Sequence, residues 1–358
     1  MEEVLKSSFG TVATFFGGLI YSYYVVSKLP KGLLRILAVI PVVGMYILLP
    51  LQLSSMHMRG TLSFIFTWIG TFKLIMLCFD LGPLANPWAN FNLFHFVGVA
   101  AFPVEINEYK PKAEPNNSSW CILRVDLIIK GCLLALLIYS YSFRHLIPQS
   151  LILMLYGVHM YLALDIVLGS QAMLLNSLIG AQLKPQSNKP YLASSLKDFW
   201  GARWNLIVTN ILRPSVYGPV LSFCWMINIK LYERSQGNQA TEAKPPLWAR
   251  GFAVISSFLV SGLMHELIFY YLTEKQPSWE VTAFFTLHGL AVAIEICLTR
   301  NLSPYITLPK FISIPTTLLI VYSTGIWLFF PPITRHGIDI KTISEYHALF
   351  QYLFPTKR

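Results

Sequence analysis

The chain has 358 residues, of which 54% are hydrophobic and only 12% charged, and its formal net charge is +10. Soluble proteins carry about 25% charged residues, so this composition excludes a soluble globular protein and predicts an all-α polytopic membrane protein. The basic residues are scattered between apolar segments, which fits contact with anionic lipid headgroups and argues against a nucleic-acid partner. The five cysteines lack metal-ligand spacing, so we expect no metal site and no resident cofactor.

Apolar segments near the length of about 20 residues that a membrane-spanning helix needs recur along the chain. They cover residues 8–27, 33–53, 61–79, 125–143, 148–168, 215–232, 248–272, 280–299 and 312–330. Because no long polar block interrupts them, we predict a single integral-membrane domain over residues 1–358 with about eight to nine transmembrane helices. Lysine and arginine are denser after the first segment than before it, which places the N-terminus in the lumen and the next loop in the cytosol.

Polar residues inside these segments are few. Asp126 and Lys130 are four residues apart, so they are expected to satisfy each other. His288 and Glu295 share a helical face and are interpreted as interior polar contacts, with a substrate tunnel as the alternative. If the fifth helix continues beyond residue 168, it carries a stripe of small and polar residues that we expect to pack against other helices. The stripe consists of Tyr161, Asp165, Gly169, Ala172 and Asn176.

His265 and Glu266 lie inside the apolar run from Leu247 to Leu272. A charged side chain at the centre of a bilayer costs about 2.5–3.5 kcal/mol on insertion scales, so such residues usually face the bundle interior and mark a functional site. The simpler alternative is a buried histidine that bonds a neighbouring helix. Because adjacent helical residues diverge by about 100°, Glu266 either orients His265 or bonds another helix.

A second polar constellation occupies residues 194–214. Ser195 and Asp198 have the spacing of a capping box, with aspartate in the position of glutamate, and predict the start of a helix. One face of that helix would be apolar, as in an amphipathic helix that lies at the membrane interface or re-enters it. The apolar face comprises Leu196, Phe199, Trp200 and Trp204.

The rotated face of the same predicted helix is polar. It carries Asn205, Thr209 and Arg213 at four-residue spacing, and Pro214 is predicted to end the helix. A simple interfacial anchor would explain the tryptophans and Lys197, but it gives no reason for Asn205 and Asp198 in the same helix.

These two constellations suit acyl transfer from a soluble thioester to a lipid hydroxyl. The alcohol needs a general base, which is usually histidine, and the carbonyl oxygen that gains negative charge needs a fixed donor such as an asparagine amide. The chain has no Gly-x-Ser-x-Gly motif, which favours direct transfer without a covalent intermediate. The same intramembrane residues would also suit a proton-coupled transporter, so that class of function stays open.

The chain resembles the plant wax synthase family of the membrane-bound O-acyltransferase superfamily over nearly its whole length. The resemblance rests on Ser-Leu-Lys-Asp-Phe-Trp-Gly-Ala-Arg-Trp-Asn and Ser-Gly-Leu-Met-His-Glu-Leu, within a motif core at 188–272, and on flanking segments at 277–282 and 335–346. It implies an enzyme of the endoplasmic reticulum membrane that uses acyl-CoA as co-substrate. It also implies that His265 is the catalytic histidine and Asn205 the second active-site residue. We expect Asp198 and Glu266 to support these two residues.

One departure from the family pattern concerns the CoA moiety. Family members usually carry two arginines after the glycine of the first motif, whereas Ala202 takes the first position here. The acyl-CoA contacts are then expected from Lys197, Arg203, Arg213, Trp200 and Trp204.

The acceptor is the least determined substrate. Members of this family use fatty alcohols, sterols, or diacylglycerol together with acetyl-CoA. We expect a long-chain fatty alcohol and a wax ester product, with sterol O-acyltransferase and diacylglycerol acetyltransferase as the alternatives.

Overall fold

A computed structural model describes residues 2–86, 92–103, 106–108, 117–179, 182–236, 244–302 and 308–354. The all-α prediction is confirmed, since most of the described residues are helical. Two short strands also pair in antiparallel fashion, with Ile106 opposite Leu183. The elements are α1 Glu2–Tyr24, α2 Leu33–Leu48, α3 Met56–Ser63, α4 Thr71–Leu77, α5 Leu93–Ala101, β1 Ile106–Glu108, α6 Asn117–Ser140, α7 Gln149–Ile179, β2 Gln182–Leu183, α8 Leu196–Asp198, α9 Leu206–Leu212, α10 Gly218–Gln236, α11 Leu247–Thr273, α12 Glu280–Leu302, α13 Lys310–Thr324, α14 Pro331–Arg335 and α15 Ile338–Leu353.

Eight helical stretches within these ranges are long and apolar enough to cross a membrane, which confirms the predicted count. They are Ser8–Lys28, Leu33–Gln52, Met56–Leu77, Val125–Leu146, Gln149–Leu178, Leu247–Thr273, Glu280–Arg300 and Lys310–Arg335. The ninth predicted segment, 215–232, is helical as α10 but is not among them. Its 19 residues include Lys230, Glu233 and Arg234, so α10 is less apolar than the eight spanning stretches.

The chain forms two compact units. Unit 1 comprises residues 1–186, 268–276 and 329–358, and unit 2 comprises residues 187–267 and 277–328. The chain crosses from one unit to the other four times, and one of these crossings lies inside α11. The single-domain assignment of the sequence stays a prediction.

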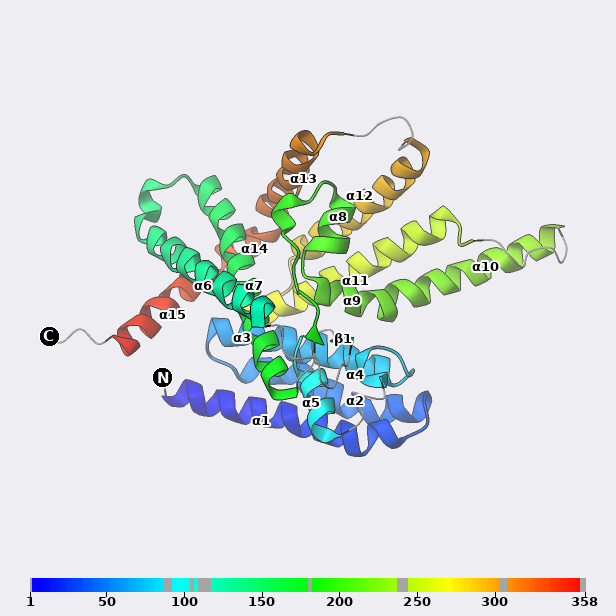
Figure 1. Ribbon diagram of the computed structural model, residues 1–358, viewed down its shortest axis with the longest axis horizontal. Helices are drawn as coiled ribbons and strands as arrows, with labels where there is room; N and C mark the ends of the chain where they lie inside the picture. Colours follow the sequence, from blue (N-terminus) through cyan, green and yellow to red (C-terminus); the bar gives the residue numbers. More distant parts are fainter. Residues whose placement is uncertain are drawn as a thin grey trace. The chain divides into compact units, whose positions relative to one another are not determined.

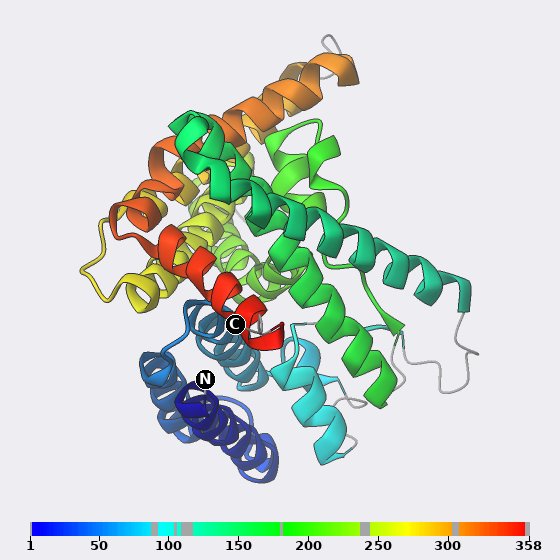
Figure 2. The same cartoon turned by 90° about the vertical axis from the view of Figure 1, so that its left-hand side faces the viewer.

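The core of unit 1 is built from α1, α2, α4, α5 and the π-helical turn at 64–70. Phe15 of α1 stacks on Phe66 with ring centroids 4.2 Å apart, and the Tyr46 hydroxyl donates to the Phe15 carbonyl at 2.8 Å. Figures 1 and 2 both show α5 beside the blue helices of the N-terminal region. The buried Lys73 ammonium donates to the carbonyls of Val99 and Phe102, both at 2.6 Å, and so satisfies backbone oxygens at the C-terminal end of α5.

Helices α6 and α7 of unit 1 pack against each other (Figure 1). The predicted pair is confirmed and extended, since Lys130 donates to both Asp126 and Asp165. Gly169 makes the close approach possible, because a Cβ atom at this position would lie 2.9 Å from a Leu127 methyl carbon. The fifth span does continue to Ile179. Asp165 and Gly169 of its small-and-polar stripe contact α6, whereas Ala172 packs with Phe102 at the end of α5, so these members pack against other helices as expected.

Unit 2 contains the amphipathic segment, and here the expectation of one continuous helix was wrong. Helix α8 passes into a π-helical turn at 199–203, and the chain then breaks because Trp204 is extended and Asn205 is left-handed at φ 37°. The Thr209 hydroxyl donates to the Trp200 carbonyl at 3.0 Å and ties the two sides of the break together. Figure 1 shows α8 beside α12.

The predicted end of this segment at Pro214 was also wrong. The chain stays helical from Leu206 into α10 through a π-helical turn at 213–217. A proline removes one backbone donor, and the wider turn absorbs the loss without ending the helix.

Candidate functional site

His265 lies on α11, and one hydrogen bond determines the position of its ring proton. Its Nδ1 is 2.8 Å from the carbonyl oxygen of Ser261, one helical turn earlier. A carbonyl oxygen can only accept, so Nδ1 carries the hydrogen. In a neutral imidazole the lone pair then belongs to Nε2, which is the form a general base requires.

An aromatic ring packs on His265 and connects it to Trp200. The Phe285 ring of α12 stacks on the imidazole with centroids 4.1 Å apart and an interplanar angle of 23°. Phe285 also contacts the Trp200 ring at 5.6 Å, and Phe258 meets Trp200 edge-on at 5.7 Å. Trp200 therefore joins the aromatic surroundings of the histidine within unit 2, instead of only facing lipid.

A second histidine of unit 2, His288, has both ring nitrogens engaged. The indole N–H of Trp200 donates to Nδ1 at 2.8 Å, and Nε2 lies 2.8 Å from the Thr324 hydroxyl. An indole N–H can only donate, so the hydrogen of neutral His288 is on Nε2 and is given to Thr324. The prediction that His288 makes interior polar contacts is confirmed, and these bonds distinguish it from His265.

Glu266 is buried and bonds another helix, which was one of the two expected outcomes. Its carboxylate accepts from the backbone N–H groups of Trp279, at 2.8 Å, and Thr282, at 3.1 Å, and from the Thr282 hydroxyl at 3.1 Å. These donors lie at the start of α12, where the first backbone N–H groups lack helical partners. Glu266 therefore caps α12 and positions the helix that carries Phe285.

Asn205 occupies the break in the amphipathic segment. Asparagine tolerates the left-handed backbone better than most residues, and here it is also the N-cap of α9. Its carboxamide oxygen accepts from the Val208 N–H at 3.5 Å, which leaves the NH₂ group as its donor end. Asn205, Thr209 and Arg213 therefore do not form the predicted polar stripe on one continuous helix, because the chain breaks at Asn205 before the other two.

Asp198 and Arg203 hold the same segment together. The Asp198 carboxylate accepts from the Ser194 N–H at 3.0 Å and from Arg203 Nε at 2.7 Å, while the Ser195 hydroxyl caps the Asp198 N–H as predicted. Burial alone would raise the pKa of Asp198, but these hydrogen bonds and the Arg203 charge hold it below its usual value. Arg203 also donates to the carbonyl of Asn188 at 3.3 Å, so it anchors the preceding loop.

The remaining predicted contacts differ in exposure. Lys197 and Arg213 are exposed, as is Ala202, whereas Trp204 stacks on Phe199 at 5.5 Å. The backbone N–H of Lys197 donates to Glu295 at 3.1 Å, but this hydrogen bond is exposed, so it is not the interior contact that was predicted for that glutamate.

The sequence did not single out Ser261 or Phe285 as partners of His265. Ser261 could have been found from its position four residues earlier on the same helix, because its carbonyl is then within reach of a histidine ring. Nothing in the sequence indicated Phe285.

Comparisons with known proteins all point to one family. The Membrane bound O-acyl transferase family matches residues 183–287, a range that contains both motifs. A long-chain-alcohol O-fatty-acyltransferase of Simmondsia chinensis is 36% identical over 98% of this chain and 96% of its own length. An acyl-CoA–sterol O-acyltransferase of Arabidopsis thaliana is 33% identical over 95% and 94%, and a probable long-chain-alcohol O-fatty-acyltransferase of the same plant is 36% identical over 96% of both chains.

Proposed function

Because the chain belongs to the membrane-bound O-acyltransferase family and is a multi-pass membrane acyltransferase, we propose that it transfers an acyl group from acyl-CoA to the hydroxyl of a lipid alcohol. The products are an ester and free CoA. Similarity to long-chain-alcohol acyltransferases over nearly the full length of both chains carries this proposal. A long-chain fatty alcohol is the first acceptor to test, and a sterol is the second because a sterol acyltransferase is almost as similar.

The proposed general base is His265. The Ser261 carbonyl holds the hydrogen on Nδ1, so Nε2 accepts the proton of the alcohol as its oxygen attacks the thioester carbonyl carbon. The carbon–sulfur bond then breaks, and the proton on Nε2 passes to the departing CoA thiolate. The proposed reaction uses no covalent enzyme intermediate and no cofactor.

The oxyanion of the tetrahedral intermediate needs a donor, and we assign it to the Asn205 carboxamide. Its oxygen is directed to the Val208 N–H, so its NH₂ group is the end available to donate. Asn205 and His265 belong to the same compact unit, which supports a shared role.

For the CoA phosphates, exposure favours Lys197 and Arg213 over Arg203. Arg203 already holds Asp198 and the 188–189 loop, so it acts in this proposal by positioning the segment. The exposed Ala202 next to it supplies no charge. The proposed location is the endoplasmic reticulum membrane, which imaging of a fluorescent fusion beside a reticulum marker tests.

The decisive experiment uses purified protein in nanodiscs. Labelled palmitoyl-CoA and acetyl-CoA are each offered with hexadecanol, a sterol and diacylglycerol, and the ester is identified by mass spectrometry. His265→Ala should lose transfer by about 10²-fold or more, the usual contribution of a general base, while its melting curve stays near that of the wild type. A folded His265→Ala protein with wild-type turnover would refute the assignment of the base.

A further inference from the structure

Unit 1 contains a partly open, mostly apolar cavity of about 360 Å³, a volume within the ~300–1,000 Å³ range of small-molecule sites. Three helical stretches contribute most of its walls, namely α3 with the π-helical turn after it, α7, and α15. On α7 the lining positions recur every three or four residues from Tyr156 to Gln171, which corresponds to about 22 Å along the helix axis. This slot has the shape to receive a long alkyl chain.

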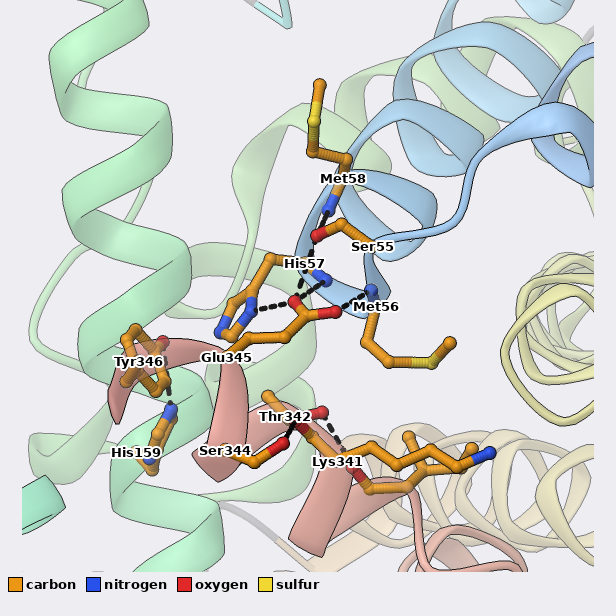
Figure 3. Close-up of polar contacts among 11 residues, drawn as sticks. Ser55, Met56, His57, Met58, His159, Lys341, Thr342, Ser344, Glu345 and Tyr346 are labelled. Carbon is orange, nitrogen blue, oxygen red and sulfur yellow. Dashed lines mark hydrogen bonds and ion pairs between the residues drawn. The ribbon is translucent and has the colours of Figure 1, made fainter. Parts of the chain in front are cut away.

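One end of the cavity is polar, and His57 is its central group (Figure 3). Its Nδ1 lies 2.7 Å from the Glu345 carboxylate, which also accepts from the backbone N–H groups of Met56 at 2.6 Å and His57 at 3.1 Å, and from the Ser55 hydroxyl at 2.9 Å. Burial alone would raise the pKa of Glu345, but these bonds hold it below its ordinary value, so the group is a carboxylate.

That carboxylate determines which ring nitrogen of His57 can accept. Because an ionised Glu345 cannot donate, Nδ1 of His57 carries the hydrogen, and Nε2 of the neutral ring has the lone pair. Figure 3 shows Nε2 on the side of the ring that faces Tyr346 and His159. Nε2 is buried and has no hydrogen-bond partner among the described residues.

Two further lining side chains have buried acceptor atoms without a partner in the described part of the chain. Asp339, whose side chain is 7% exposed, uses Oδ2 to accept from the Tyr156 hydroxyl at 2.8 Å and to pair with Arg144, whereas its Oδ1 is unpaired. Gln171, fifteen residues along α7, has an unpaired Oε1.

All three orphan atoms are therefore acceptors, and each costs about 1–3 kcal/mol while it stays unsatisfied. A ligand relieves this cost only if it brings a donor. A carboxylate or phosphate head has acceptors alone, and it would also face the negative charges of Glu345 and Asp339. A hydroxyl brings a donor without charge.

We propose that this cavity binds an uncharged lipid carrying a hydroxyl, with the hydroxyl donating its one hydrogen to His57 Nε2 and the chain lying along α7. That this lipid is the acceptor of acyl transfer rests on the proposed function, whereas its binding does not. The ligand class is a hydroxylated lipid, and long-chain alcohol, sterol and diacylglycerol are the sources that the experiment separates.

The test uses full-length His265→Ala protein, which cannot consume the ligand, and a photoreactive long-chain alcohol carrying an alkyne. Cross-linked peptides should come from α3, α7 and α15. Hexadecanol should displace the probe at about tenfold or more lower concentration than hexadecyl methyl ether or palmitic acid, because the ether and the ionised acid lack the donor. Sterol and diacylglycerol are run in parallel, and the best hydroxylated competitor identifies the lipid.

Two phenylalanine substitutions on one helix provide the matched control. Ala163 lines the cavity, whereas Val158 on α7 is exposed and does not. Ala163→Phe should reduce cross-linking about tenfold or more and raise the KM for the alcohol, while Val158→Phe should change neither. Ala163→Leu is the milder variant if the larger ring prevents folding.

Several results would overturn the proposal. These are equal competition by the methyl ether or the fatty acid, stronger competition by hexadecylamine than by hexadecanol, or cross-links confined to other helices. The proposed function fails separately: binding with no ester formed from any acceptor would leave the cavity site standing. Unchanged cross-linking in folded Ala163→Phe would instead remove the cavity site and leave the acyl transfer.

Discussion

Removal of the Glu266 carboxylate tests whether this residue acts on α12 or on His265. Glu266→Ala removes a buried carboxylate and leaves three donors at the start of α12 without their acceptor, namely the N–H groups of Trp279 and Thr282 and the Thr282 hydroxyl. Loss of the cap together with the lost hydrogen bonds costs about 2–4 kcal/mol. In a chain of this length about 2 °C of melting temperature corresponds to 1 kcal/mol, so we expect a fall of about 4–8 °C.

The assay is a melting curve in nanodiscs combined with turnover at a temperature where the variant is folded. A capping role predicts the fall in melting temperature with kcat within about fivefold of the wild type, since the His265 proton is held by Ser261 and not by Glu266. Glu266→Gln, which keeps one oxygen acceptor, should have a melting temperature between those of the wild type and Glu266→Ala. An unchanged melting temperature with a kcat as low as that of His265→Ala would contradict this reasoning.

Three further changes have definite expected outcomes. His288→Phe removes the partner of the Trp200 indole and should lower stability by about 1–3 kcal/mol, but kcat should stay well above that of His265→Ala because both His288 nitrogens already serve structural bonds. Asn205→Gly keeps the left-handed backbone and should preserve the melting curve while kcat falls about 10²-fold; a wild-type kcat would remove the oxyanion role. The folded-state pKa of Glu345 lies below its unfolded value, so its contribution to stability is present above the unfolded pKa and is lost as pH falls through the folded one. Melting curves from pH 7 to 4 should therefore fall more steeply for wild type than for Glu345→Gln, and parallel curves would exclude this linkage.

The sequence by itself determined the class of protein and singled out the candidate site residues. Apolar segments of spanning length are a local property, so all eight spans of the structure were found from composition alone. His265 stood out because polar side chains are costly inside such segments, and Asn205 stood out on the polar face of the predicted amphipathic helix. The Asp126–Lys130 pair followed from helical spacing.

Only the tertiary structure decided how those residues are used. Glu266 could face His265 or another helix, and the choice depends on where the start of α12 lies, which no local pattern encodes. The break at Asn205 overrode a periodicity that predicted one helix, because the Thr209–Trp200 bond and the Asp198–Arg203 pair stabilise a bent path. The His57–Glu345 pair spans 288 residues of sequence, so the polar end of the cavity exists only where packing brings α3 and α15 together.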